Sequence, residues 1–254
     1  MIITKTPYRV SFFGGGTDHP SWYKKHGGSV LSTTIDKYCY VTCRYLPPFF
    51  KENNRIVYSK IELTKHANEI NHPLIRESIK HAGIKRGVEI HHHGDVPGWS
   101  GMGTSSSFTV GLLRALYALK GQMVDKKRLA YDAITVEQKR VRDVVGSQDQ
   151  VAASFGGLNR IDFLPNGKIN VNPIILPPKR LSDFQSHLLL FFTGIVRRSS
   201  DIEEEKVANF HQNKENLIKM AKMVDKGIKI LKNGDLNDFG KLMHEAWVLK
   251  KALS

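Results

Sequence analysis

The first half of the chain alternates hydrophobic and polar positions in short stretches that glycine-rich breaks separate. Residues 1–13, MIITKTPYRVSFF, alternate in this way and are rich in β-branched and aromatic side chains, which predicts a strand. The same signal recurs over residues 27–46, 87–97 and 154–176. The last of these stretches predicts a hairpin, because Pro165, Asn166 and Gly167 are typical turn residues between two alternating runs.

Helical periodicity dominates elsewhere, and it is clearest over residues 104–120. Helices are also predicted over residues 21–27, 63–83, 125–146 and 201–254, the last interrupted at Asn233-Gly234. Residues 187–200, HLLLFFTGIVRRSS, predict a buried strand followed by a loop. The irregular order of strands and helices indicates an α+β fold. The segment PPKR at 177–180 suggests a seam between two domains, 1–180 and 181–254.

Composition narrows the class of protein. The 254 residues are 41% hydrophobic and 24% charged, as in ordinary globular proteins. No apolar run approaches about 20 residues, and the N-terminus lacks the layout of a signal peptide, so a cytoplasmic protein without a membrane partner is expected. Cys39 and Cys43 would share one face of a strand, which predicts two buried thiols rather than a zinc site. The consecutive histidines 91–93 would alternate faces and therefore predict packing rather than a metal site.

The net charge of +14 favours an anionic partner, which leaves nucleic acid, a membrane surface and phosphorylated small molecules open. The basic residues are dispersed, with no run of five, and a nucleic-acid interface usually needs a stripe with interleaved aromatics. The charge therefore argues against a nucleic-acid partner, and it is also compatible with a solvated surface alone.

Residues 97–107, PGWSGMGTSSS, place three glycines and five hydroxyl side chains at the entrance of the clearest helix. The first turn of a helix has unpaired N–H groups and a positive dipole end, and glycines let a ligand approach the main chain. The stretch lacks the lysine of the common ATP-binding loop and the third glycine of the dinucleotide fingerprint. A flexible helix cap and a phosphate-binding loop both remain open on these residues alone.

Three segments in order resemble the motifs of the GHMP small-molecule kinases. The stretch from Pro97 to Ser106 is similar to the second motif, TPYRVSFFGGGTD resembles the first, and GSQDQ resembles the segment with the catalytic aspartate. The GGGTD form is similar to the branch that phosphorylates D-glycero-D-manno-heptose 7-phosphate at O1. The resemblance implies a ribosomal-S5-domain-2-like N-terminal half followed by a ferredoxin-like C-terminal half. The family's third glycine-rich motif is absent, so we expect that second half to be incomplete.

The resemblance also implies roles for individual residues. Backbone N–H groups of the loop would cradle the ATP phosphates, Mg²⁺ would bind Ser105 and Glu137, and Asp149 would be the base with Arg9 as its neighbour. Other interpretations stay open: Arg9 on a wet strand face, Glu137 as a surface partner, Asp149 as a helix cap. The full set of predicted phosphate-binding residues is Pro97, Ser100, Gly101, Met102, Gly103, Thr104, Ser105 and Ser106.

The acceptor site is expected at the first motif. Asp18 would bind a pair of sugar hydroxyls beside Gly15, Gly16 and Thr17, although an Asx turn is an alternative. Arg197 and Arg198 are candidates for a second phosphate, since guanidinium groups bind phosphate in a bidentate manner.

The expected reaction is ATP-dependent phosphorylation of the anomeric hydroxyl of heptose 7-phosphate, giving the 1,7-bisphosphate for nucleotide-activated heptose synthesis. A fucokinase-like or other sugar kinase is the first alternative. A basic nucleic-acid-binding protein and an inactive regulatory relative are further alternatives, and a homodimer is left open.

Overall fold

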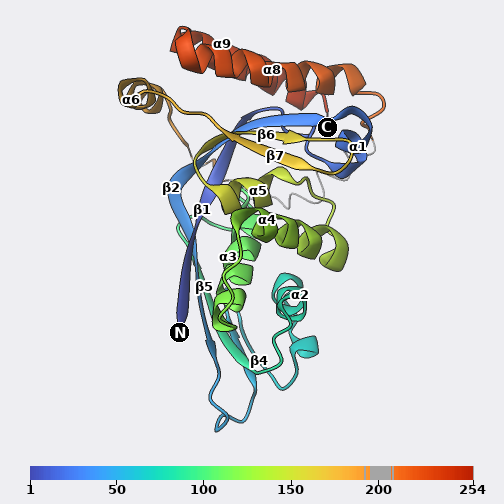
Figure 1. Cartoon of the computed structure of the whole chain (residues 1–254), viewed down its shortest axis with the longest axis vertical. Coiled ribbons are helices and arrows are strands. Elements are labelled where there is room, and N and C mark those ends of the chain that lie inside the picture. Colours follow the sequence, from blue (N-terminus) through green and yellow to red (C-terminus); the bar gives the residue numbers. More distant parts are fainter. Residues whose placement is uncertain (192, 195–206, 208, 254) are drawn as a thin grey trace. The chain divides into compact units, whose positions relative to one another are not determined.

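The computed structural model describes residues 1–191, 193–194, 207 and 209–253 (Figure 1), and the folded chain divides into two compact units. Unit 1 comprises residues 1–9, 35–144 and 149–155, and unit 2 comprises residues 10–34, 145–148 and 156–254. Strands β1 (Ile2–Phe13) and β2 (Gly28–Tyr45) pair with each other, and each contributes residues to both units. The predicted α+β class is confirmed. The predicted organisation into consecutive domains 1–180 and 181–254 stays a prediction.

Unit 1 contains a mixed sheet with helices packed against it. The second half of β2 pairs antiparallel with β5 (Val88–Gly94), which pairs parallel with β3 (Asn54–Val57), and β3 pairs antiparallel with β4 (Ile61–Thr64). The helical elements are η1 (Ala67–Glu69), α2 (Pro73–Ala82), α3 (Thr104–Leu119), α4 (Lys126–Ile134), the π-helical η2 (Thr135–Val141) and α5 (Gln148–Phe155), whose first residue belongs to unit 2.

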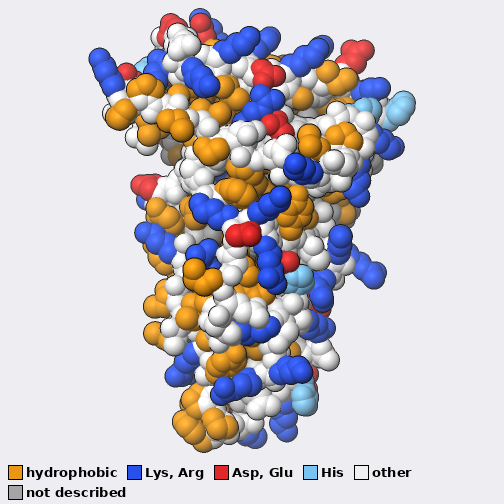
Figure 2. Space-filling model, in the orientation of Figure 1, with side chains coloured by type: hydrophobic (Ala, Val, Ile, Leu, Met, Phe, Trp, Pro, Cys, Tyr) orange, Lys and Arg blue, Asp and Glu red, His pale blue; other side chains and the backbone are white. Residues whose placement is uncertain are grey.

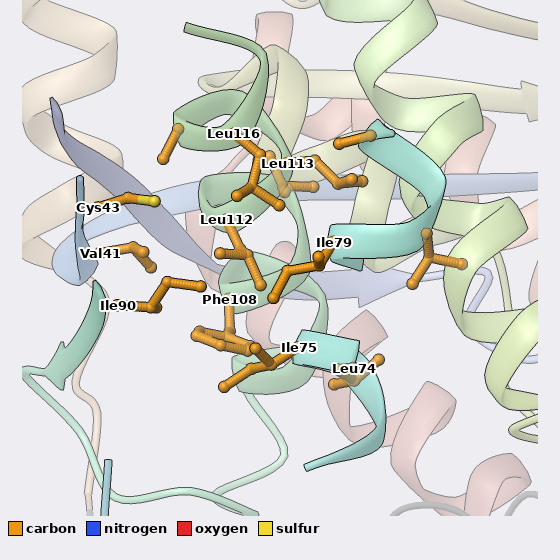
Figure 3. Close-up of a cluster of buried hydrophobic side chains, with 14 of the residues drawn as sticks. Val41, Cys43, Leu74, Ile75, Ile79, Ile90, Phe108, Leu112, Leu113 and Leu116 are labelled. Atoms are coloured by element: carbon orange, nitrogen blue, oxygen red, sulfur yellow. The ribbon is translucent and has the colours of Figure 1, made fainter. Parts of the chain in front are cut away.

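The core of unit 1 lies between β2, β5 and the helices α2 and α3. Figure 3 shows Val41 and Cys43 of β2 facing Leu112 and Leu116 of α3 across the interior. The strand residues are spaced by two and the helix residues by four, so each set lies on one face of its element. Both predicted buried thiols are confirmed, and burial raises the pKa of Cys39 and of Cys43 to about 12.

The histidines of β5 alternate as predicted. The His91 ring nitrogen Nε2 lies 3.0 Å from a Glu89 carboxylate oxygen, whereas the His92 ring packs on Phe108 with ring centroids 4.7 Å apart. Burial lowers the pKa of His92 to about 4. Among the described residues no group of three metal-ligating side chains converges.

Unit 2 is built on the first half of β2, which pairs with β6 (Leu158–Phe163). The predicted hairpin is confirmed: β6 and β7 (Ile169–Pro173) pair antiparallel around Gly167, whose φ is +82°. A second core forms where Phe12 packs edge-to-face on Phe184 and Phe239. The helices are α1 (Pro20–His26), α6 (Pro178–Ser186), α8 (Lys214–Asn233) and α9 (Leu236–Lys251), with the predicted break between the last two at Gly234.

Two predicted elements are wrong within the described residues. The helix predicted over 63–83 begins only at Pro73, because residues 61–64 form β4 against β3. The buried strand predicted from His187 does not form over residues 187–191, where Leu189 and Phe191 are 81% and 77% exposed. A strand needs a partner for its backbone hydrogen bonds, and no described strand pairs with this segment.

Two further sequence-based expectations concern the surface. No helix among the described residues is long and apolar enough to cross a membrane. Figure 2 shows Lys and Arg side chains spread over the visible face and interspersed with hydrophobic and neutral ones. This distribution agrees with the dispersed charge of the sequence, and on this face no single basic stripe stands out.

Candidate active site

The loop between β5 and α3 leaves the first turn of α3 without a side-chain cap. Gly103 is the N-cap residue in a left-handed conformation (φ +69°), and no side chain of the described residues caps the helix. The Ser107 hydroxyl instead donates to the Pro7 carbonyl over 3.0 Å. The alternative that the loop hydroxyls serve as a helix cap is therefore wrong. Uncapped N–H groups at the positive end of a helix are suited to binding an anion.

The other predicted phosphate-binding residues lie along the same loop. Gly101 and Ser105 are exposed, and Met102 and Thr104 are half-buried. The Ser100 hydroxyl is buried and has no hydrogen-bond partner among the described residues. Trp99 has a positive φ of 59°, which is unusual for a side chain of this size and marks local backbone strain. Among the described residues, the loop thus keeps the Ser100 hydroxyl unpaired in addition to the uncapped helix N-terminus.

Arg9 of β1 and Asp149 of α5 form a bidentate ion pair beside this loop. The Arg9 Nε and Nη2 atoms each lie 2.7 Å from one Asp149 carboxylate oxygen, and Nη1 donates to the Gly101 carbonyl over 2.8 Å. The side chains are only 14% and 23% exposed, so the interpretation of Arg9 as a wet surface arginine is wrong. A Cβ on Gly103 would lie 3.0 Å from Asp149 Oδ2. The carboxylate therefore lies directly against the loop.

Glu137 is a buried carboxyl group in the π-helical segment η2. It is 1% exposed, and its Oε2 accepts hydrogen bonds from the Ser106 hydroxyl at 3.0 Å and the Gln150 amide at 2.7 Å. The surface interpretation of Glu137 is therefore wrong. Desolvation raises its pKa to about 7, opposed by the Thr109, Gln150 and Ser106 hydrogen-bonding groups and assisted by the negative charge of Asp149. Rare π-helical turns often occur at functional sites.

The second carboxylate oxygen of Glu137 decides whether the site can bind a metal ion. Its Oε1 is fully buried and has no partner in hydrogen-bond geometry among the described residues. Mg²⁺ binds oxygen ligands, and a cation would offset the cost of burying this carboxylate. The hydroxyl bonded to Glu137 is that of Ser106, whereas the predicted ligand Ser105 is exposed. The carboxylate fits a Mg²⁺ ligand, and Ser105 as its partner stays a prediction.

The glycine loop of residues 14–18 in unit 2 is tightly bonded. The Asp18 carboxylate is 2% exposed and accepts hydrogen bonds from the backbone N–H of Gly16 (3.0 Å) and of Gln148 (3.1 Å), and from the Gln148 side-chain amide (3.0 Å). The Thr17 hydroxyl donates to the Gly14 carbonyl over 2.7 Å. A Cβ on Gly14 would lie 1.9 Å from the Ser29 carbonyl oxygen, so only glycine fits there. Gly15 and Gly16 are the more accessible members.

The structure therefore brings together Arg9 with Asp149, and Ser106 with Glu137. The sequence-based reasoning missed three residues: Gln150, which bonds to Glu137, and Gln148 and Ser11, which form a chain of hydrogen bonds to Asp18. The signal was present, since GSQDQ places an amide side chain on each side of Asp149. Arg197 and Arg198 lie outside the described residues.

Known proteins are similar to this chain in sequence and in fold. Residues 63–157 match the family model of the GHMP kinases N terminal domain. The chain is 28% identical to the D-glycero-alpha-D-manno-heptose 7-phosphate kinase of Campylobacter jejuni over 100% of its own length and 78% of the relative's. It is 25% identical to the bifunctional fucokinase/GDP-fucose pyrophosphorylase of Arabidopsis thaliana over 97% of its own length, but spans only 26% of that relative.

Solved structures agree with the sequence relatives. A D-glycero-D-manno-heptose 1-phosphate kinase from Bacteroides thetaiotaomicron superposes with a TM-score of 0.84 at 25% identity, covering 99% of this chain and 79% of that one. The phosphomevalonate kinase of Streptococcus pneumoniae, in complex with phosphomevalonate and AMPPNP, superposes with a TM-score of 0.78 at 19% identity, covering 100% and 81%. The motifs, the fold and these comparisons agree that the chain is similar to the GHMP kinases, and residues 63–157 match the N-terminal domain of that family.

Proposed function

We propose that this protein transfers the γ-phosphoryl group of ATP to the anomeric hydroxyl of a sugar phosphate, with D-glycero-D-manno-heptose 7-phosphate as the substrate. The observation that supports a transferase most directly is the Arg9–Asp149 pair beside the uncapped N-terminus of α3. The choice of sugar is supported by the relatives named as heptose phosphate kinases. The GGGTD segment points the same way.

The loop and α3 would bind the nucleotide phosphates. Backbone N–H groups from Gly101 to Ser106 supply donors, and the helix dipole adds positive potential where the anion sits. Glu137 and Ser105 would hold Mg²⁺, which in such sites neutralises charge on the phosphate oxygens. Ser106 and Gln150 fix the Glu137 carboxylate so that its remaining oxygen keeps one orientation.

Asp149 would act as the general base. Its carboxylate takes the proton from the anomeric hydroxyl while that oxygen bonds to the γ-phosphorus and the bond to the β-phosphate oxygen breaks, which releases ADP. Arg9 holds both carboxylate oxygens by bidentate hydrogen bonds, which fixes the orientation of Asp149. Proton abstraction of this kind contributes about 10²–10⁴-fold to the rate.

Residues 15–18 would form the floor of the acceptor site. Gly15 and Gly16 leave their backbone accessible to a sugar, and Thr17 and Asp18 hold the shape of the loop through buried hydrogen bonds. Direct binding of sugar hydroxyls by Asp18 remains part of the proposal. Its three N–H donors support an additional role in holding the loop.

The test is a screen of ATP-dependent ADP release across free and phosphorylated sugars, with phosphorus NMR of the product to locate the new phosphate. The proposal predicts release with heptose 7-phosphate and an anomeric phosphate in the product. Activity on unphosphorylated fucose or galactose alone would replace the substrate while keeping the reaction. Absence of sugar-dependent ADP release would contradict the function itself.

A further inference from the structure

Gln148 is the first residue of α5 and directly precedes Asp149 in the chain. Its side-chain Oε1 accepts a hydrogen bond from the Ser11 hydroxyl over 2.7 Å, and its Nε2 donates to Asp18 Oδ1 over 3.0 Å. Its backbone N–H donates to the other carboxylate oxygen, Asp18 Oδ2, over 3.1 Å. One residue therefore binds both oxygens of the Asp18 carboxylate and is itself fixed to β1. All of these groups belong to unit 2.

The backbone around Gln148 is shaped for this contact. The Ser147 N–H donates to the Asp18 carbonyl over 3.0 Å, so two consecutive residues bind Asp18. A Cβ on Gly146 would lie 1.9 Å from Asp18 Oδ2, which leaves no room for a larger residue. Three consecutive positions, 146–148, thus fit closely around one buried carboxylate. Such convergence indicates that the orientation of the 14–18 loop depends on this segment.

The Gln148 amide also borders the accessible part of the loop. A carboxamide nitrogen has two hydrogens, and the bond to Asp18 uses one of them. A Cβ on Gly15 would lie 3.8 Å from Gln148 Nε2, which is ordinary contact distance, so this nitrogen borders the backbone of Gly15. Asp18 is 2% exposed, whereas Gln148 is only half-buried.

We propose that Gln148 is a specificity-determining residue of the acceptor site. It holds Asp18 and the 14–18 loop in place with one amide hydrogen and offers the second to an oxygen of a hydroxyl-rich acceptor above Gly15. The acceptor role rests on the proposed function. An acceptor site that presents a fixed N–H donor discriminates strongly against an analogue lacking the matching oxygen, because the analogue would cover the donor without pairing it.

The test is Gln148→Glu beside Gln185→Glu, which makes the same chemical change at an exposed position of α6. The introduced carboxylate cannot donate to Asp18 when it is ionised, and two carboxylates at this distance share a proton. At pH 8 we expect the acceptor KM to rise at least tenfold and the ATP KM to stay within twofold. At pH 5.5, where the two carboxylates share a proton, the acceptor KM should return most of the way to the wild-type value. The neighbouring titratable group, His19, pairs with Ser21 at 2.8 Å.

Ser11→Ala should raise the acceptor KM by a smaller factor, since it removes only the bond to Gln148 Oε1. Equal increases in both KM values, an increase that does not depend on pH, or the same result for Gln185→Glu would overturn the proposal. Equal increases in the acceptor KM and the ATP KM would indicate that Gln148 has a merely structural role.

A second measurement does not need kinase activity. The free energy of unfolding of Gln148→Glu, compared with Gln185→Glu, should fall as pH rises from 5.5 to 8, because the variant then places two negative charges together. If the wild type releases no ADP with any sugar, the proposed function is wrong, and so is the proposed hydrogen bond from Gln148 to the acceptor. A pH-independent difference between the two variants would overturn the Gln148–Asp18 bridge whatever the activity.

Discussion

Two glycine-rich loops of this chain differ in how completely their polar groups are paired. In the loop of residues 97–106, α3 begins without a side-chain cap and the Ser100 hydroxyl is buried without a partner among the described residues. In the loop of residues 14–18, Asp18 accepts three N–H groups and Thr17 bonds back to Gly14. Both loops are rich in glycine, but they use the surrounding donors and acceptors differently.

The comparison shows that glycine-rich loops serve two different structural roles in this chain. Where glycines lead into a helix whose N–H groups stay unpaired, they leave a site for an anion such as phosphate. Where glycines permit close contact, with the Ser29 carbonyl at Gly14 and with the Asp18 carboxylate at Gly146, they fix the shape of the loop. The first loop is suited to binding charge, and the second is suited to holding a fixed shape against which a polyol can bind.

A large effect is expected from Arg9, which joins the proposed base Asp149 to the open loop. Arg9→Gln removes both bonds to Asp149 and the bond to the Gly101 carbonyl, so kcat should fall about 10²–10³-fold. Steady-state kinetics with Arg128→Gln as the control would measure it, since the Arg128 side chain is 60% exposed. Comparable losses in the two variants would contradict a specific role for Arg9.

The next effect compares a glycine that is packed against a neighbouring side chain with a glycine that has free space around it. Gly146→Ala should destabilise the protein by about 3 kcal/mol, because its Cβ would lie 1.9 Å from Asp18 Oδ2. A Cβ at Gly98 in the open loop meets no atom of the described residues within 4 Å, so Gly98→Ala should change the free energy of unfolding by less than about 0.5 kcal/mol. Urea unfolding of both variants measures the difference, and similar stabilities would mean that the 14–18 loop is not closed as described.

Glu137 gives a pH-dependent prediction of moderate size. Burial raises its pKa from 4.5 to about 7, so the folded protein retains a proton that the unfolded chain releases between these values. Stability from this group is therefore present below pH 4.5 and is lost as pH rises to 7. Glu137→Gln should remove that slope and stabilise the metal-free protein by about 2 kcal/mol at pH 8.

The check is urea unfolding at pH 5 and pH 8 in the presence of EDTA. Glu245→Gln serves as a control, since Glu245 is an exposed carboxyl group of α9. An unchanged slope in Glu137→Gln would contradict the raised pKa of Glu137.

The smallest effect separates two neighbouring hydroxyls of the open loop. Ser106→Ala removes the hydrogen bond to Glu137 and should lower the free energy of unfolding by about 1 kcal/mol. Ser105→Ala should leave stability almost unchanged while raising the Mg²⁺ concentration needed for half-maximal transfer, and EDTA should abolish transfer. Thermal unfolding and Mg²⁺ titration separate the two, and a reversed pattern would exchange the roles of these serines.

Local patterns predicted much of the fold. β1, the hairpin and α3 follow from alternation, turn residues and helical period, which depend on neighbouring residues alone. β4 was missed because its four residues precede a longer helical pattern and depend on pairing with β3. The segment 187–191 shows the converse, since an apolar composition predicts a strand but cannot supply its partner.

The sequence pointed to several residues of the candidate site, but it did not predict the hydrogen bonds among them or the partners Ser11, Gln148 and Gln150. The motifs pointed to Arg9, Glu137 and Asp149, but the pairing of Asp18 with Gln148 joins residues 130 positions apart. The raised pKa of Glu137 results from burial by several elements, and no local pattern reports it. The choice between Ser105 and Ser106 depends on the direction of two adjacent side chains at a helix N-terminus, which the sequence leaves open.

The central claim is that Asp149, held by Arg9 beside the open loop, is the base for phosphoryl transfer. The most direct measurement is sugar-dependent ADP release by the wild type and Asp149→Asn, which keeps the size of the side chain and removes its basicity. The account predicts a fall in kcat of about 10²–10⁴-fold with the ATP KM within twofold. Transfer that continues at the wild-type rate in Asp149→Asn would contradict it.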